Sequence, residues 1–166
     1  MTYRVGMQMK SSIIAVLLTA AVSMPVHAQM PNAYGTAISL ENAKKAAAAA
    51  LAEMRANKWL MAVAVVDTGG HLVYFEKTDG TQTGSVDVAI DKARSAVLFK
   101  RPTKAIQDTL AAGGEGLRML GVRGMVPVEG GVPIVMNGLM VGGIGLSGGT
   151  SAQDGQCAQA GAAAIK

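Results

Sequence analysis

Two pairs of apolar runs, each joined by a tight turn, constrain the fold of this chain more than any other feature. Residues 60–66 and 71–77 flank an Asp-Thr-Gly-Gly turn, and residues 132–136 and 139–147 flank an Asn-Gly turn. Asp, Asn and Gly accept the backbone angles of tight turns, and Asn-Gly between apolar runs is the strongest short-range indication of a β-hairpin. The chain is therefore expected to form an antiparallel sheet.

Helices are predicted on either side of these hairpins. Residues 40–57 are rich in alanine, lack glycine and proline, and follow Ser39, a suitable N-cap. Further helices are predicted over residues 85–100, over residues 102–112 with proline in the first turn, and from Ser151, where Ser-x-x-Asp resembles a capping box.

A further strand is predicted at residues 125–128, before a turn that contains Glu129. The predicted order is then α-β-β-α-α-β-β-β-α, with hairpins beside helices instead of alternating strands and helices. This order indicates an α+β domain in which helices flank a central antiparallel sheet of about five strands.

The first 28 residues have the features of a secretory signal peptide. Arg4 and Lys10 precede an apolar run over residues 13–22, and Val-His-Ala stands before Gln29. A membrane anchor is the alternative, but the run is shorter than the roughly 20 residues that span a bilayer. We expect a periplasmic or secreted protein with no membrane span after processing.

Residues 29–166 are expected to form a single domain. Removal of Arg4 and Lys10 lowers the net charge from +4 to +2, and the remaining charges are interspersed with few aromatic residues, so nucleic acid is not an expected partner. The single cysteine, Cys157, cannot form an intramolecular disulfide and is either a small buried apolar residue or a reactive thiol.

Three glycine-rich turns stand at predicted strand ends, at residues 67–71, 129–133 and 147–154. Glycine lets backbone N–H groups approach a ligand, and a helix N-terminus near Ser151 favours an anion. If the turns converge, they form a polar pocket, and if they do not, they are ordinary tight turns.

His71 is the only histidine after residue 28, so one chain lacks the several His or Cys ligands of a bare metal site. A haem differs, because its porphyrin already holds the iron and the protein supplies one or two axial donors. His71 is either such a donor or an exposed residue at the start of a strand. Glu129 is either a general base or the cap of its own turn.

Six short motifs follow one another along the chain, at residues 65–71, 90–96, 101–104, 129–133, 143–148 and 151–154. Taken in this order, they resemble the GlcG/HbpS haem-binding family, which includes the C-terminal domain of PduO-type corrinoid adenosyltransferases. The resemblance covers essentially all of residues 29–166. It implies a profilin-like α/β sandwich and assembly into homo-oligomers such as dimers, hexamers or octamers.

The same resemblance implies that haem is the cofactor. His71 matches the histidine that follows the family's Gly-Gly turn, and Lys92, Arg94, Arg101 and Lys104 match basic family positions. One or two of these cations are expected to pair with haem propionates, and Glu129, Gly130 and Gly131 are expected to contact the cofactor. The alternative for the cations is solvation on a helix surface.

The leading hypothesis is therefore an exported haem-binding protein for storage, delivery or sensing, without required turnover. It holds haem through one axial ligand in a cleft or subunit interface. An alternative is a small-carboxylate-binding or lyase-like enzyme that uses Glu129 and the glycine-rich backbone at residues 147–151 as an anion cradle. A third is an interaction module that docks on a sensor protein.

Overall fold

The computed structural model describes residues 1–2 and 32–166. The predicted signal peptide, residues 1–28, lies outside the described residues apart from its first two. The elements in chain order are α1 (Leu40–Ala56), β1 (Ala62–Asp67), β2 (Leu72–Lys77), α2 (Ser85–Leu98), α3 (Thr103–Ala111), the 3-10 helix η1 (Gly114–Gly121), β3 (Gly131–Met136), β4 (Leu139–Ser147) and α4 (Ser151–Ala163).

The strands form one antiparallel sheet in the order β2-β1-β4-β3, so the two predicted hairpins lie side by side. The Asn-Gly turn between β3 and β4 has positive φ at both Asn137 (51°) and Gly138 (77°), as a type I′ turn requires. The α+β class and both hairpins are confirmed.

The sheet of the described residues has four strands instead of about five, and the order is α-β-β-α-α-β-β-α. The strand predicted at residues 125–128 is wrong. Pro127 has no N–H for a ladder, and the N–H of Val126 donates instead to Oγ of Ser95 on α2, at 3.0 Å.

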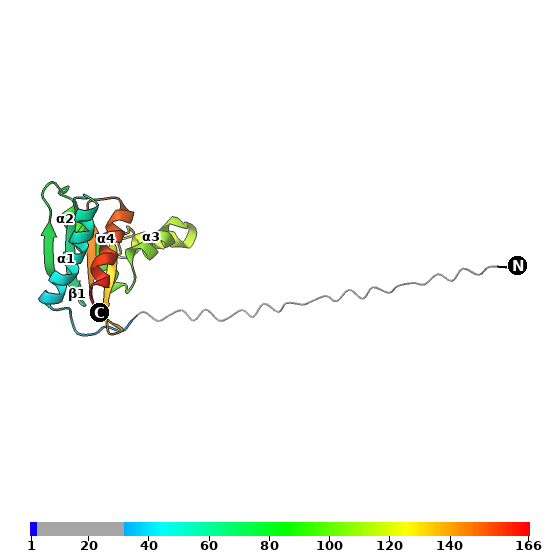
Figure 1. Ribbon diagram of the computed structural model, residues 1–166, viewed down its shortest axis with the longest axis horizontal. Helices are drawn as coiled ribbons and strands as arrows, with labels where there is room; N and C mark the ends of the chain where they lie inside the picture. Colours follow the sequence, from blue (N-terminus) through cyan, green and yellow to red (C-terminus); the bar gives the residue numbers. More distant parts are fainter. Residues whose placement is uncertain (3–31) are drawn as a thin grey trace.

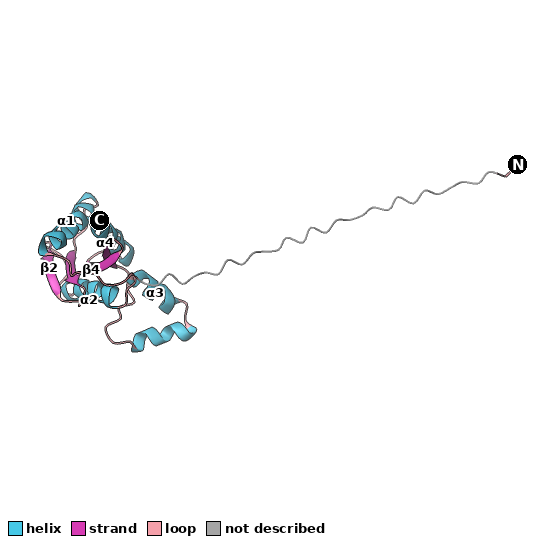
Figure 2. Cartoon of the chain, turned by 90° about the horizontal axis from the view of Figure 1, so that it is seen from below, coloured by secondary structure: helices cyan, strands magenta, loops and turns pink. Residues whose placement is uncertain are grey.

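Helices cover both faces of the sheet (Figures 1 and 2). Apolar residues of α1 and α4 pack against one face, and small residues of α2 pack against the other. Helix α2 approaches the sheet closely, because a Cβ on Gly145 of β4 would collide with the carbonyl oxygen of Ala89. Glycine in β4 therefore allows backbone-to-backbone contact between helix and strand.

The predicted helix starts differ in detail from the structure. Ser39 caps α1 as predicted, accepting the N–H of Asn42 at 3.2 Å. The capping box of α4 uses Thr150 and Gln153, one residue before the predicted Ser151, and Pro102 occupies the N-cap of α3 instead of its first turn. No helix within the described residues is long and apolar enough to span a membrane.

Helices α3 and η1 project from the body of the molecule as an arm (Figures 1 and 2). None of the eight residues of η1 is buried. Leu117, Leu120 and Val122 are all exposed, Leu120 by 68%. An apolar segment of this kind on a folded chain marks a candidate interaction surface.

Candidate functional site

The three glycine-rich turns do not meet in one chain. In the β1–β4 pair, Ala62 lies opposite Ser147 and Asp67 lies opposite Gly142, so the turn after Asp67 and the loop after Ser147 occupy opposite ends of the sheet. Strands of this length separate their ends by about 15–20 Å. Gly130 accepts the N–H of Leu146 at 2.9 Å, which places the Glu129 turn at the Ser147 end.

The turn after β1 is built around the carboxylate of Asp67. Its Oδ1 accepts the N–H of Gly69 at 2.8 Å and the N–H of His71 at 2.9 Å. Burial alone would raise the pKa of Asp67, but these two backbone donors and the imidazole outweigh burial and hold the pKa below 3.8. The imidazole of His71 is 81% exposed, with Nδ1 3.3 Å from each carboxylate oxygen.

Exposed apolar side chains lie beside this turn. A Cβ on Gly70 would lie 3.6 Å from the side chain of Leu98, and the hydroxyl of Tyr34 donates to the carbonyl oxygens of Val97 and Leu98 at 2.9 and 3.4 Å. Leu72 and Leu98 are 49% and 45% exposed. We call His71, Leu72, Leu98 and Tyr34 the His71 surface. These exposed residues belong to the turn that carries His71 and to the chain segments next to that turn.

Cations border the His71 surface. Nζ of Lys100 lies 4.1 Å from the centroid of the Tyr34 ring. Leu98 also lines a cavity of about 500 Å³ on the outer side of α2. The residues that line it are Asp91, Arg94, Leu98, Arg123, Gly124, Met125 and Val126. Leu98 therefore lies both against Gly70 of the turn that carries His71 and in the lining of the cavity that contains Arg94.

Lys104 is not part of this surface. It lies on α3, where Nζ forms an ion pair with both carboxylate oxygens of Asp108 at 2.6 and 2.7 Å. The hydrogen bond to Asp108 is the main cause that raises the pKa of Lys104. The predicted propionate partner is thus already engaged by a neighbour one turn along its own helix.

Lys92 is also engaged, and it is almost fully buried. Its Nζ donates to Oδ2 of Asp154 at 2.7 Å and to the carbonyl oxygen of Leu146 at 3.1 Å. Burial raises the pKa of Asp154 in spite of the ion pair. Sequence reasoning missed this pair, because 62 positions separate its members and no local pattern connects them.

Gly130 and Gly131 serve packing around that pair. A Cβ on Gly130, where φ is +130°, would meet Nζ of Lys92, and a Cβ on Gly131 would collide with the carbonyl oxygen of Lys92. Glu129 folds over α4, since a Cβ on Gly155 would lie 2.5 Å from its Oε1. These three predicted site residues follow one another in the chain and lie at the other end of the sheet from His71.

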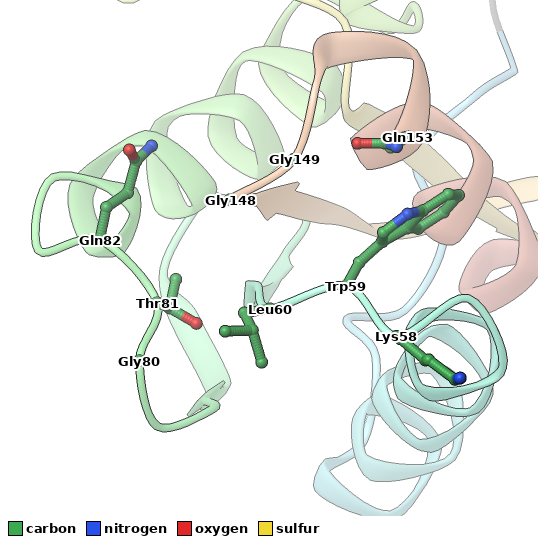
Figure 3. Close-up of a pocket in the computed structure, with 9 residues that line it drawn as sticks. All are labelled: Lys58, Trp59, Leu60, Gly80, Thr81, Gln82, Gly148, Gly149 and Gln153. Carbon is green, nitrogen blue, oxygen red and sulfur yellow. The ribbon is translucent and has the colours of Figure 1, made fainter.

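A second cavity, of about 430 Å³, lies at the Ser147 end (Figure 3). Trp59 and Gln153 stand on one side, Leu60, Thr81 and Gln82 on the other, and Gly148 and Gly149 above them; Lys58 points away from the centre.

This second cavity contains the predicted anion cradle. The cradle is capped by its own residues: Asp154 accepts the N–H of Gly149, Gln153 accepts the N–H of Thr150, and Thr150 accepts the N–H of Gln153. Glu129 is not among the described residues that line the cavity. Two N–H groups of the predicted cradle, those of Gly149 and Thr150, are therefore already engaged, and the predicted base lies outside the cavity lining.

The comparisons with known proteins decide the family. A family model described as "Haem degrading protein HbpS-like" matches residues 38–163. The chain belongs to this HbpS-like family. The resemblance predicted from the sequence motifs is confirmed.

Relatives of this HbpS-like chain include proteins of known structure. Protein GlcG of Escherichia coli K12 is 34% identical over 110 residues, which cover 66% of this chain and 81% of GlcG. The crystal structure of a double mutant of Streptomyces reticuli HbpS superposes with a TM-score of 0.73 at 34% identity, covering 80% of this chain and 89% of HbpS. A PduOC complex with haem gives a TM-score of 0.71 at 27% identity, covering 79% of this chain and 96% of PduOC.

Proposed function

We propose that this HbpS-like chain is an exported haem-binding protein that holds haem on the His71 surface, with Nε2 of His71 as the axial ligand. One observation carries the proposal: an imidazole that is 81% exposed extends from a turn that is followed by exposed Leu72 and packs, through Gly70, against exposed Leu98. A lone exposed histidine has no structural need for apolar neighbours. A haem needs both an imidazole and apolar neighbours, because its iron takes a nitrogen donor and its porphyrin faces need apolar cover.

The residues present fit a haem. Within the described residues, no three or more His, Cys, Asp and Glu side chains are grouped so that they could hold a metal ion. Haem iron needs only one axial donor from the protein, because the porphyrin supplies the other ligands. Leu98, which lies against Gly70 of the turn that carries His71, and Tyr34 would provide apolar contact. Arg94 lines the adjoining cavity and would pair with a propionate there, and Lys100 stands over the Tyr34 ring.

Bound haem would supply redox-active iron. The chain would supply the donor nitrogen, the apolar cover and the cations, and none of these roles requires turnover. The relative crystallised as a PduOC–haem complex supports haem as the ligand class. Storage, delivery and sensing all remain within this proposal, with a sensor protein as a further partner.

We also propose that the chain works as a homo-oligomer, either a dimer, a hexamer or an octamer. The exposed arm supports this, because the side chains of Leu117 and Leu120 can be buried only by another molecule or by a rearrangement of the arm. A subunit interface would also enclose haem more fully than one chain does. Export to the periplasm or the medium rests on the signal-peptide features of residues 1–28.

A hemin titration followed by absorption spectroscopy tests the function. The wild-type chain should give a saturable shift of the Soret band, and His71→Ala should change the position of that band. A Lys58→Ala variant, altered at the far end of the sheet, serves as the control and should match the wild type. Absence of a saturable shift in the wild type would remove haem as the ligand, and an unaltered His71→Ala spectrum would remove His71 as the donor.

A further inference from the structure

We infer that Asp67 is a positioning residue for the proposed iron ligand: it accepts a proton-bearing Nδ1 of His71 and so leaves Nε2 as a free lone-pair donor. The inference takes its functional meaning from the proposed function. The arrangement itself can be tested on the haem-free chain.

The turn holds the Asp67 carboxylate in a fixed orientation. Oδ1 accepts the N–H of Gly69 and the N–H of His71, at 2.8 and 2.9 Å. The backbone closes the same turn, because the N–H of Asp67 donates to the carbonyl oxygen of His71 at 2.9 Å and the N–H of Gly70 donates to that of Asp67 at 3.0 Å. The carboxylate is therefore set before any ligand arrives.

The carboxylate in turn selects the tautomer of His71. Nδ1 lies 3.3 Å from both carboxylate oxygens, and an ionised carboxylate can only accept hydrogen bonds. A neutral imidazole in this place must carry its proton on Nδ1. Free imidazole side chains prefer the opposite tautomer, with the proton on Nε2. A protonated Nε2 has no lone pair to donate to iron.

This is the arrangement that metal-binding histidines use. A ligating histidine almost always donates its other ring N–H to a carboxylate, a carbonyl or a water, which fixes the ring and raises its basicity. Nε2 of His71 belongs to a side chain that is 81% exposed, so it is available to a ligand from outside. The two hydrogen bonds from backbone N–H groups to Oδ1 are enough to cap the turn, so the contact between the carboxylate and Nδ1 of His71 is additional to what the turn requires.

Asp67→Asn separates the two roles of this side chain. The amide oxygen of asparagine can still accept the N–H groups of Gly69 and His71, so the turn is kept. The amide NH₂ replaces Oδ2 and donates instead of accepting. It therefore favours an unprotonated Nδ1 and moves the proton of His71 to Nε2.

The first measurement needs no haem. The full chain, with ¹⁵N-labelled histidine, is studied by long-range ¹H–¹⁵N NMR at a pH where the imidazole is neutral, and a His71→Ala sample separates its signal from that of His27. The wild type should show protonated Nδ1 and bare Nε2, and Asp67→Asn should show the reverse with an unchanged melting temperature. A wild type with protonated Nε2, or a tautomer that Asp67→Asn leaves unchanged, overturns the inference.

The second measurement adds hemin. Loss of a partner of this kind typically weakens metal binding by about 10- to 100-fold, so Asp67→Asn should bind hemin at least about tenfold more weakly and should raise the reduction potential of the bound iron. If His71→Ala changes the Soret band but Asp67→Asn changes neither quantity, the positioning role is refuted while the proposed function stands. If His71→Ala leaves the spectrum unaltered, His71 is refuted as the iron ligand. The NMR measurement on the haem-free chain then decides whether Asp67 sets the tautomer of His71.

Discussion

The ammonium of Lys92 lies 2.7 Å from Oδ2 of Asp154, and the two side chains are only 2% and 3% exposed. This ion pair joins the middle of α2 to the first turn of α4 across the end of β4. Oδ1 of Asp154 accepts the N–H of Gly149, and Lys92 also donates to the carbonyl oxygen of Leu146. Both charges are thus paired and hydrogen-bonded, the condition under which buried charges persist in proteins.

Removing one partner of this pair should be far more costly than removing both. Lys92→Met leaves the Asp154 carboxylate buried without its cation and should lower the free energy of unfolding by about 3–5 kcal/mol. Lys92→Met combined with Asp154→Asn removes both charges and should recover a large part of that loss. Urea unfolding followed by circular dichroism measures both variants. Equal costs for the single and double variants would contradict this account of the pair.

Gly145 should tolerate no side chain, because α2 lies against it. A Cβ there would collide with the carbonyl oxygen of Ala89 and crowd Ala93, so Gly145→Ala should cost about 1–3 kcal/mol of stability or more. Gly121, at the end of η1, has nothing within 4 Å of an added Cβ, and Gly121→Ala is the matched control. Thermal unfolding should separate the two variants clearly, and equal melting temperatures would show that α2 packs less closely than described.

The stability of the protein should depend on Cys157 in alkaline solution. Burial first, and the charges of Glu53 and Asp154 second, raise the pKa of Cys157 from 9.0 to about 11. The folded state therefore keeps the thiol proton where the unfolded state loses it, and stability falls as the pH rises from about 9 to 11, by up to about 2–3 kcal/mol. Cys157→Ala should lack this loss. A constant difference between the two proteins across that window would contradict the predicted shift.

The arm should control assembly. Leu117→Ser combined with Leu120→Ser removes exposed apolar area from η1, where no residue is buried, so the fold of each chain should be kept while the oligomer weakens. Sedimentation velocity compares the variant with the wild type, and circular dichroism checks the fold. Leu40→Ser, which alters an exposed leucine at the start of α1, is the control. If the double variant keeps the wild-type assembly, the arm is not the interface.

Local sequence patterns predicted much of the fold. The Asn-Gly turn, the alanine-rich helix α1 and its Ser39 cap depend on residues within a few positions of one another, and the structure has all three. The apolar run at residues 125–128 misled the strand prediction, because a short apolar run with proline does not by itself define a strand.

The candidate site depended on longer-range relationships. The sequence indicated three turns but not their placement, since that depends on β1 lying between β2 and β4. No local pattern indicated that Leu98 lies against Gly70 of the His71 turn, or that Lys92 lies against Gly130 of the Glu129 turn at the opposite end of the sheet. The hydrogen bonds of Asp67 to Gly69 and His71, by contrast, span at most four positions and could have been predicted as an Asx turn.

The location of bound haem tests the central claim most directly. Ferric hemin is paramagnetic and broadens the NMR signals of nearby nuclei, so titration into ¹⁵N-labelled protein identifies the residues around the iron. We expect the amide signals of His71, Leu72 and Leu98 to disappear first, while those of Trp59 and Gly149 at the other end of the sheet persist. Selective broadening at Trp59 and Gly149, with the His71 signal intact, would contradict the proposal.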